Sequence, residues 1–114
     1  PAVLRAIKKT IDAGHETGIW VGLCGEMGGT PSLAVLLMGM GIDEISTNAA
    51  TVPLVKKAIR SFPFAKARSW AEEALSFSTA EEVENFLRIR AKKGLRGILQ
   101  EEQQAAIDPA EGLA

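Results

Sequence analysis

The stretch Gly18-Ile19-Trp20-Val21-Gly22-Leu23-Cys24-Gly25-Glu26-Met27-Gly28-Gly29-Thr30-Pro31 passes from an apolar segment through a glycine-rich turn to the start of a helix. Residues 18–23 lack the alternation of polar and apolar side chains that marks a half-exposed strand. They therefore predict a parallel strand that is buried on both faces. Cys24 is the only cysteine of the chain and ends this strand. Reactive groups of α/β enzymes lie at this end of the strands, so Cys24 is a candidate catalytic residue.

A helix is predicted directly after the glycine-rich turn. Thr30 is a good N-cap, and Pro31 suits the first helical position because its missing N–H costs nothing there. The helix is expected over about 31–40. Gly39 or Gly41 is expected to end it, since glycine commonly closes a helix.

A second helix is predicted before the strand and is expected to stop at Gly14. It is indicated by apolar residues at helical spacing: Val3, Leu4, Ile7 and Ile11. His15 then falls in a loop, where a solvated side chain is expected. Trp20 and Trp70 are expected to be core or helix-packing anchors.

The segment that follows repeats the order of strand and helix. Residues 42–47 predict a short second strand, and Asn48 begins a turn that this residue type commonly supports. Thr51 is expected to cap a further helix with Pro53 in its first turn and with an apolar side made of Leu54, Val55, Ala58, Ile59 and Phe62. The order helix, strand, helix, strand, helix predicts a parallel sheet built from βαβ connections.

Two more helices are predicted beyond this unit. Pro63 opens the first, with residues at roughly helical spacing: Phe64, Ala67, Trp70, Ala71, Ala74 and Leu75. Residues 78–82 offer two registers of a capping box for the second, which buries Val83, Phe86 and Leu87 and stops at Gly94. Residues 95–114 are expected to form a polar tail, partly helical or disordered.

Composition and charge narrow the class of protein. The chain has 114 residues, 46% hydrophobic and 24% charged, with a formal net charge of −1, which predicts a globular domain and no nucleic-acid or membrane partner. A small basic cluster of Lys56, Lys57 and Arg60 is typical of a solvated face. The longest apolar stretch, around residues 33–40, is too short to span a bilayer. A single cysteine cannot form an internal disulfide, which favours a cytoplasmic location.

Two strands make too small a parallel sheet to bury both faces. We therefore expect these βα units to belong to a larger doubly wound sheet or barrel, of which this chain is the C-terminal end. A chain of this kind that folds alone must complete its sheet by self-association or leave an apolar edge exposed. A homo-oligomer is expected for this reason.

Three blocks of sequence carry a resemblance to a known family. Residues 22–29, 38–46 and 52–60 resemble, in order and spacing, the end of the phosphoenolpyruvate-binding barrel of the phosphoenolpyruvate-protein phosphotransferases, enzyme I of the bacterial sugar phosphotransferase system. The resemblance implies an α/β fold in which residues 1–94 are the C-terminal portion of a (β/α)8 TIM barrel, with added helices. It also implies that Cys24 protonates enolpyruvate after the phosphoryl group has left phosphoenolpyruvate for a histidine, so that pyruvate is formed.

The resemblance also implies which groups accompany Cys24. Gly25 and Glu26 are expected at the substrate-binding rim, and no metal ligand is expected in this chain. Mg²⁺ and a phosphocarrier protein are implied for the full-length enzyme, through segments that this chain lacks, so the chain alone is expected to be inactive. Thr30 stands where related sequences commonly carry an aspartate.

Two alternatives remain open. The chain could be part of a pyruvate, phosphate dikinase or a phosphoenolpyruvate synthase, which share this type of barrel and a similar Cys-Gly-Glu motif. It could also be a non-catalytic oligomerisation or regulatory module, which the departure at Thr30 slightly favours. The sequence upstream of this chain would distinguish the first alternative from a phosphotransferase. A nucleotide-grasp domain there would indicate a dikinase or a synthase, and a small helical domain that binds a carrier protein would indicate a phosphotransferase.

Overall fold

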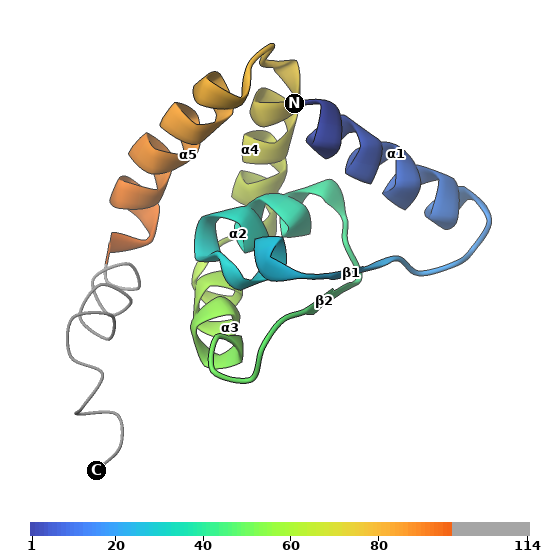
Figure 1. Cartoon of the computed structure of the whole chain (residues 1–114), viewed down its shortest axis with the longest axis horizontal. Coiled ribbons are helices and arrows are strands. Elements are labelled where there is room, and N and C mark those ends of the chain that lie inside the picture. The colour runs from blue at the N-terminus through green and yellow to red at the C-terminus, as the bar shows by residue number, and fades with distance from the viewer. Residues whose placement is uncertain (97–114) are drawn as a thin grey trace.

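The computed structural model describes residues 1–96, which are mostly helical with one small sheet (Figure 1). Helix α2 lies in the middle, with α1 and α5 diverging on either side of it. The elements follow in the order α1 (Ala2–Glu16), β1 (Gly22–Cys24), the short 3-10 helix η1 (Glu26–Gly29), α2 (Pro31–Met40), β2 (Glu44–Ser46), α3 (Val52–Ser61), α4 (Phe64–Ser76) and α5 (Ala80–Gly94).

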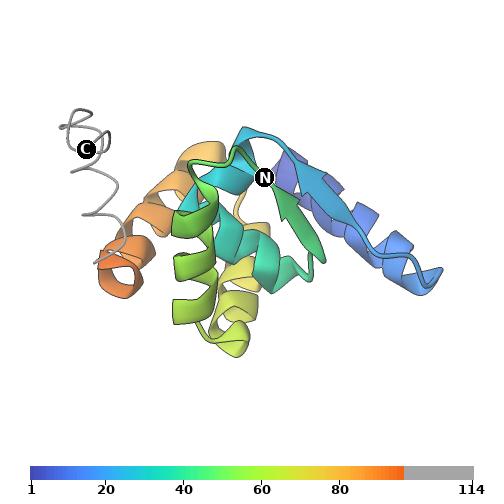
Figure 2. The same cartoon turned by 90° about the horizontal axis from the view of Figure 1, so that it is seen from below.

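The sheet consists of β1 and β2, which run parallel and are joined through α2 (Figure 2). Gly22 pairs with Glu44, and Cys24 pairs with Ser46. The predicted parallel βαβ order is thereby confirmed, and so is Cys24 as the last residue of its strand. Because the strands are parallel, their carboxyl ends lie at the same edge of the sheet.

Helix α2 forms the centre of the core because it is apolar on every side. Ala34, Val35, Leu36 and Leu37 are all fully buried in it. It contacts both α3 and α4. The helix ends at Gly41 in the left-handed conformation, with φ of 94°, which confirms one of the two expected end points.

Gly39 allows α2 and α4 to approach closely. A Cβ atom built on Gly39 would lie 2.0 Å from the carbonyl oxygen of Ala67 in α4. No side chain fits at that distance, so this glycine sets the separation of the two helices.

Aromatic side chains join α3, α4 and α5. The ring of Trp70 lies edge-on to those of Phe62 and Phe86, with centroids 4.5 Å and 6.1 Å away. Phe77 packs edge-on against Phe86 as well, at 5.4 Å. Trp70 is 3% exposed and is therefore the core anchor that its sequence position predicts.

The capping box at the start of α5 uses Thr79, which selects one of the two predicted registers. The Thr79 hydroxyl accepts the N–H of Glu82 at 3.2 Å, and the Glu82 carboxylate accepts the N–H groups of Thr79 and Ser78 at 2.9 Å and 3.0 Å. These bonds, led by the one from the Thr79 N–H, lower the pKa of Glu82.

Thr79→Ala is expected to lower the free energy of unfolding by about 1 kcal/mol, because an N-terminal donor of α5 loses its acceptor. Ser78→Ala is the matched control, since only the backbone of Ser78 takes part in the box. Chemical denaturation of both variants measures the difference. Equal losses in the two variants would contradict this assignment of the cap.

The strand predicted over residues 18–23 is shorter and more exposed than expected. Ile19 and Trp20 are 62% and 65% exposed, so the prediction of a strand buried on both faces and of Trp20 as a core anchor was wrong. The sheet described here has only two strands, and the second edge of β1 has no neighbouring strand within residues 1–96. Phe64, placed on an apolar face by its spacing, is also exposed because it stands at the first turn of α4.

Helix α1 continues past Gly14, where it was expected to stop. Gly18, with φ of 74°, supplies the left-handed turn instead. The N–H of Gly18 bonds to the His15 carbonyl at 3.0 Å and that of Ile19 to the Gly14 carbonyl at 2.9 Å, which together form a Schellman motif. His15 therefore lies in the last turn of α1 and not in a loop.

Most of the predicted tail lies outside the described residues. Leu95, the first residue assigned to it, is 1% exposed and packs in the core. The interpretation of residues 97–114 as a polar tail stays a prediction.

Candidate active site

Cys24 lies at the carboxyl end of β1 with its side chain exposed. Ser46, its partner in register, ends β2 at the same edge of the sheet. Cys24 lies outside the core, so its thiol is accessible to a ligand without rearrangement of packed side chains. Within residues 1–96 the Cys24 side chain has no hydrogen-bond or ionic partner.

The turn after Cys24 is held against β2. Gly25 adopts φ of 137°, and its N–H donates to the Ser46 carbonyl at 3.3 Å, which carries the pairing one residue past the strand. The predicted glycine-rich turn then takes the form of the 3-10 helix η1. Glu26 opens η1 with an exposed side chain that has no hydrogen-bond or ionic partner in the part of the chain described. Its carboxylate is therefore free to face a ligand, and it does not orient the thiol.

The turn after β2 is held by Asn48. Its side-chain oxygen accepts the N–H of Thr51 at 3.0 Å, and the hydroxyl of Thr51 lies 3.4 Å from that of Thr47. Thr51 precedes α3 as expected, but its hydroxyl does not cap that helix. Asn48 thus supports the turn, which is the role that this residue type commonly has.

Thr30 stands at the N-cap of α2, as predicted, with an extended backbone. Its hydroxyl accepts no N–H from the first turn of the helix. A side chain that makes no capping bond can be exchanged with little effect on folding.

The opposite end of the sheet carries a hydrogen-bonded pair of side chains that the sequence did not reveal. His15 Nε2 lies 2.7 Å from Asp43 Oδ2, and the same oxygen accepts the N–H of Val21 at 2.8 Å. The His15 side chain is exposed, as expected of a solvated residue, but its bond to Asp43 was not predicted. The two residues lie 28 positions apart in sequence, and only the reversal at Gly18 brings α1 back beside the start of β2.

The hydrogen bonds of Asp43 predict a pH dependence of stability. The bond from His15, and then that from the Val21 N–H, lower the pKa of Asp43 below its ordinary value of 3.8. A carboxyl with a lowered pKa stabilises the folded state above its ordinary pKa, and this contribution is lost as the pH falls through the lower folded value. Below about pH 4 the chain is therefore expected to lose more stability than its Asp43→Asn variant. Denaturation titrations between pH 5 and pH 2 compare the two, and parallel profiles would contradict the expectation.

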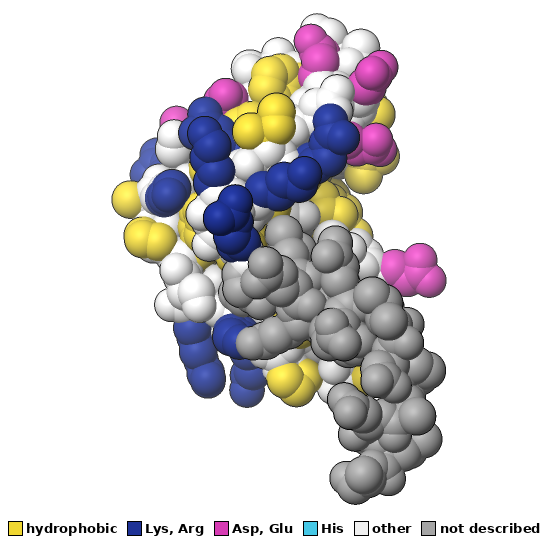
Figure 3. Space-filling model, turned by 90° about the vertical axis from the view of Figure 1, so that its left-hand side faces the viewer, with side chains coloured by type: hydrophobic (Ala, Val, Ile, Leu, Met, Phe, Trp, Pro, Cys, Tyr) yellow, Lys and Arg dark blue, Asp and Glu magenta, His cyan; other side chains and the backbone are white. Residues whose placement is uncertain are grey.

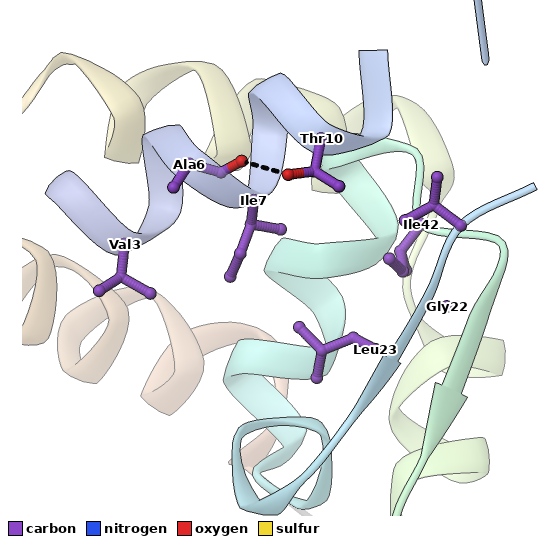
Figure 4. Close-up of a pocket in the computed structure, with 8 residues that line it drawn as sticks. Val3, Ala6, Ile7, Thr10, Gly22, Leu23 and Ile42 are labelled. Atoms are coloured by element: carbon purple, nitrogen blue, oxygen red, sulfur yellow. Dashed lines mark hydrogen bonds between the residues drawn. The ribbon is translucent and has the colours of Figure 1, made fainter. Parts of the chain in front are cut away.

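A groove of about 280 Å³ lies between α1 and β1, and Cys24 is not among the residues that line it (Figure 4). Its walls are formed by Val3, Ala6, Ile7, Thr10, Val21, Gly22, Leu23 and Ile42. These side chains are apolar apart from Thr10, whose hydroxyl donates to the Ala6 carbonyl at 2.9 Å. The groove therefore has no group that could do chemistry on a substrate.

Lys and Arg side chains gather on the face of the molecule shown in Figure 3, which is the side where α5 lies. The basic cluster of α3, which comprises Lys56, Lys57 and Arg60, is exposed as expected of a solvated face.

Among residues 1–96, no group of three or more His, Cys, Asp or Glu side chains is placed to hold a metal ion. The helices of this part of the chain are all too short or too polar to cross a membrane.

Comparison with known proteins identifies the family. The family of PEP-utilising enzymes, PEP-binding domain, matches residues 1–64, which is more than half of the 114 residues. The chain belongs to the PEP-utilising enzyme family. The match includes α1, both strands and the turn that carries Cys24, so the candidate site lies within the PEP-binding domain.

Among the relatives of this chain are phosphoenolpyruvate-protein phosphotransferases. That of Haloferax volcanii is 48% identical over 89 residues, and that of Haemophilus influenzae is 45% identical over 87 residues. These matches cover 78% and 76% of this chain. The chain spans only 16% and 15% of the lengths of the two relatives.

Proposed function

We propose that this chain forms part of a phosphoenolpyruvate-protein phosphotransferase, which transfers a phosphoryl group from phosphoenolpyruvate to a histidine and releases pyruvate. The observation that carries the proposal is Cys24, an exposed thiol at the carboxyl end of a parallel strand within the PEP-binding domain. The names of the relatives favour this enzyme over the dikinases and synthases.

Cys24 is proposed to be the acid that converts enolpyruvate to pyruvate. When the bond between phosphorus and the enol oxygen breaks, the phosphoryl group passes to the histidine and an enolate remains. The enolate gains a C–H bond at C3 as the thiol gives up its proton. The exposed thiolate then regains a proton from water. A thiol suits this task because it keeps its proton at neutral pH, whereas an ordinary carboxylic acid is ionised.

Gly25 and Glu26 are proposed to line the substrate side of the same rim. Gly25 has no side chain between the backbone and a ligand, and the Glu26 carboxylate is exposed without a partner among the described residues. Their position directly after Cys24 supports this assignment, since both follow the strand end on which the chemistry would take place.

Residues 1–94 are proposed to be the closing part of a (β/α)8 barrel. Two observations support this proposal. The strands β1 and β2 run parallel and are joined by a helix, as in such a barrel. The second edge of β1 is unpaired within residues 1–96, which fits a sheet that continues beyond β1. The apolar groove beside β1 fits the same idea, because a neighbouring strand would bury its walls.

Other parts of the proposal concern the whole protein. A phosphocarrier partner, a homo-oligomer and a cytoplasmic location go with a phosphotransferase of this type. Mg²⁺ goes with it as well, but residues 1–96 offer no ligand set for it, so no step is assigned to a metal here.

The proposed function is tested in a full-length polypeptide that carries this chain. On incubation with phosphoenolpyruvate and no nucleotide, we expect equal amounts of pyruvate and of acid-labile phosphohistidine on the protein. Passage of the phosphoryl group from the histidine to an added adenine nucleotide, and not to a carrier protein, would identify a dikinase or a synthase instead. The absence of both products would favour a non-catalytic module.

A further inference from the structure

Asp43 is bonded to Val21 twice, at the end of the sheet opposite Cys24. The N–H of Asp43 donates to the Val21 carbonyl at 3.0 Å, and its Oδ2 accepts the Val21 N–H at 2.8 Å. His15 Nε2 reaches the same oxygen at 2.7 Å. Since an ionised carboxylate can only accept, the hydrogen of this bond lies on Nε2. The last turn of α1 is thereby tied to the residues that lead into both strands.

We infer that Asp43 and His15 are positioning residues, which fix the register of β1 against β2. Val21 and Asp43 directly precede Gly22 and Glu44, the first pair of the ladder. A slip of one residue would break both Val21 bonds and would turn every side chain of β1 to the other face of the sheet. The inference rests on the proposed function, in that Cys24 is the side chain whose position then matters.

The short length of the strands makes such a device necessary. Each strand has only three residues, so the ladder itself contributes few hydrogen bonds that specify the register. The side chains of His15 and Asp43 are 42% and 38% exposed, so solvent screens electrostatic attraction between them. The register is fixed mainly by hydrogen-bond geometry, because Asp43 Oδ2 accepts from His15 in α1 and from the Val21 N–H before β1. Electrostatic attraction contributes less.

Amide hydrogen exchange of the 114-residue chain tests the inference. In Asp43→Ala we expect about tenfold faster exchange at Val21, which loses its acceptor, and a similar change at Gly25, which bonds to Ser46 at the far end of the ladder. Asp43→Asn should restore both rates to within about threefold, because an amide oxygen in the place of Oδ2 still accepts both the Val21 N–H and the His15 Nε2–H. Glu16→Ala is the matched control, an exposed neighbour of His15 without a partner in the described chain.

Faster exchange at both Val21 and Gly25, with rescue by asparagine, supports a role in register. A change at Val21 with none at Gly25 would show a purely local contact and would overturn the inference. Equal acceleration at the buried Ala74 amide of α4 would show general loosening and would overturn it too. The measurement needs no turnover, so its failure would leave the role of Cys24 standing, and loss of that role would leave the register device intact.

Discussion

Gly39→Ala is expected to lower the free energy of unfolding of this chain by about 2–3 kcal/mol, although alanine favours helices over glycine by about 1 kcal/mol. The added Cβ would lie 2.0 Å from the Ala67 carbonyl oxygen, 2.4 Å from its carbon and 2.9 Å from the Arg68 nitrogen. All three are backbone atoms of α4, which cannot move aside as the end of a flexible side chain can. Helices α2 and α4 must therefore separate at the centre of the core.

Gly18→Ala is the matched control for Gly39→Ala. Gly18 has φ of 74°, but a Cβ added to it would meet no atom of the described chain within 4 Å, so alanine there brings backbone strain without a clash. We expect a loss of about 1 kcal/mol in this variant. Urea denaturation of the two variants compares them, and an equal or smaller loss in Gly39→Ala would contradict the packing of α2 against α4.

Cys24→Ala, in a full-length polypeptide that carries this chain, is expected to slow the formation of pyruvate by about 10²–10⁴-fold, the usual contribution of a general acid. Phosphoryl transfer to the histidine should continue for one turnover, because the thiol acts only after the P–O bond has broken. Rapid-quench measurement of phosphohistidine and of pyruvate in the same reaction separates the two steps.

Ser46→Ala provides the control for Cys24→Ala. Ser46 lies beside Cys24 in register and ends the neighbouring strand, but within residues 1–96 its hydroxyl is bonded only to Glu44, at 3.2 Å. We expect both steps to keep their rates in this variant to within about threefold, since losing such an exposed hydrogen bond costs little. Pyruvate formation that is slowed equally in both variants would assign the effect to the rim as a whole and not to the thiol.

The features that sequence predicts well are those set by neighbours along the chain. The apolar run of α2 with Thr30 and Pro31 before it marks a buried helix, and Cys24 ends a strand because a glycine-rich turn follows it. The capping box of α5 is equally local, since Thr79 and Glu82 stand three positions apart.

The features that sequence does not predict depend on what the folded chain brings together. The pairing of His15 with Asp43 arises only once Gly18 has reversed the chain and α2 has crossed over. The exposure of Ile19 and Trp20 was not predicted for a different reason. An apolar pattern records which side chains suit burial, but it does not record whether a neighbouring strand is present to bury them.

The central claim, that Cys24 protonates the enol, is tested most directly by the stereochemistry of the new methyl group. Phosphoenolpyruvate that carries deuterium in one position at C3 is converted in tritiated water, in the full-length polypeptide and in its Cys24→Ala variant. A proton donor fixed on one side of the enolate predicts a chiral methyl group in the parent protein. In the variant, enolpyruvate released to water gains its hydrogen on either face, which predicts a racemic methyl group. A chiral methyl group from the Cys24→Ala variant would contradict the account.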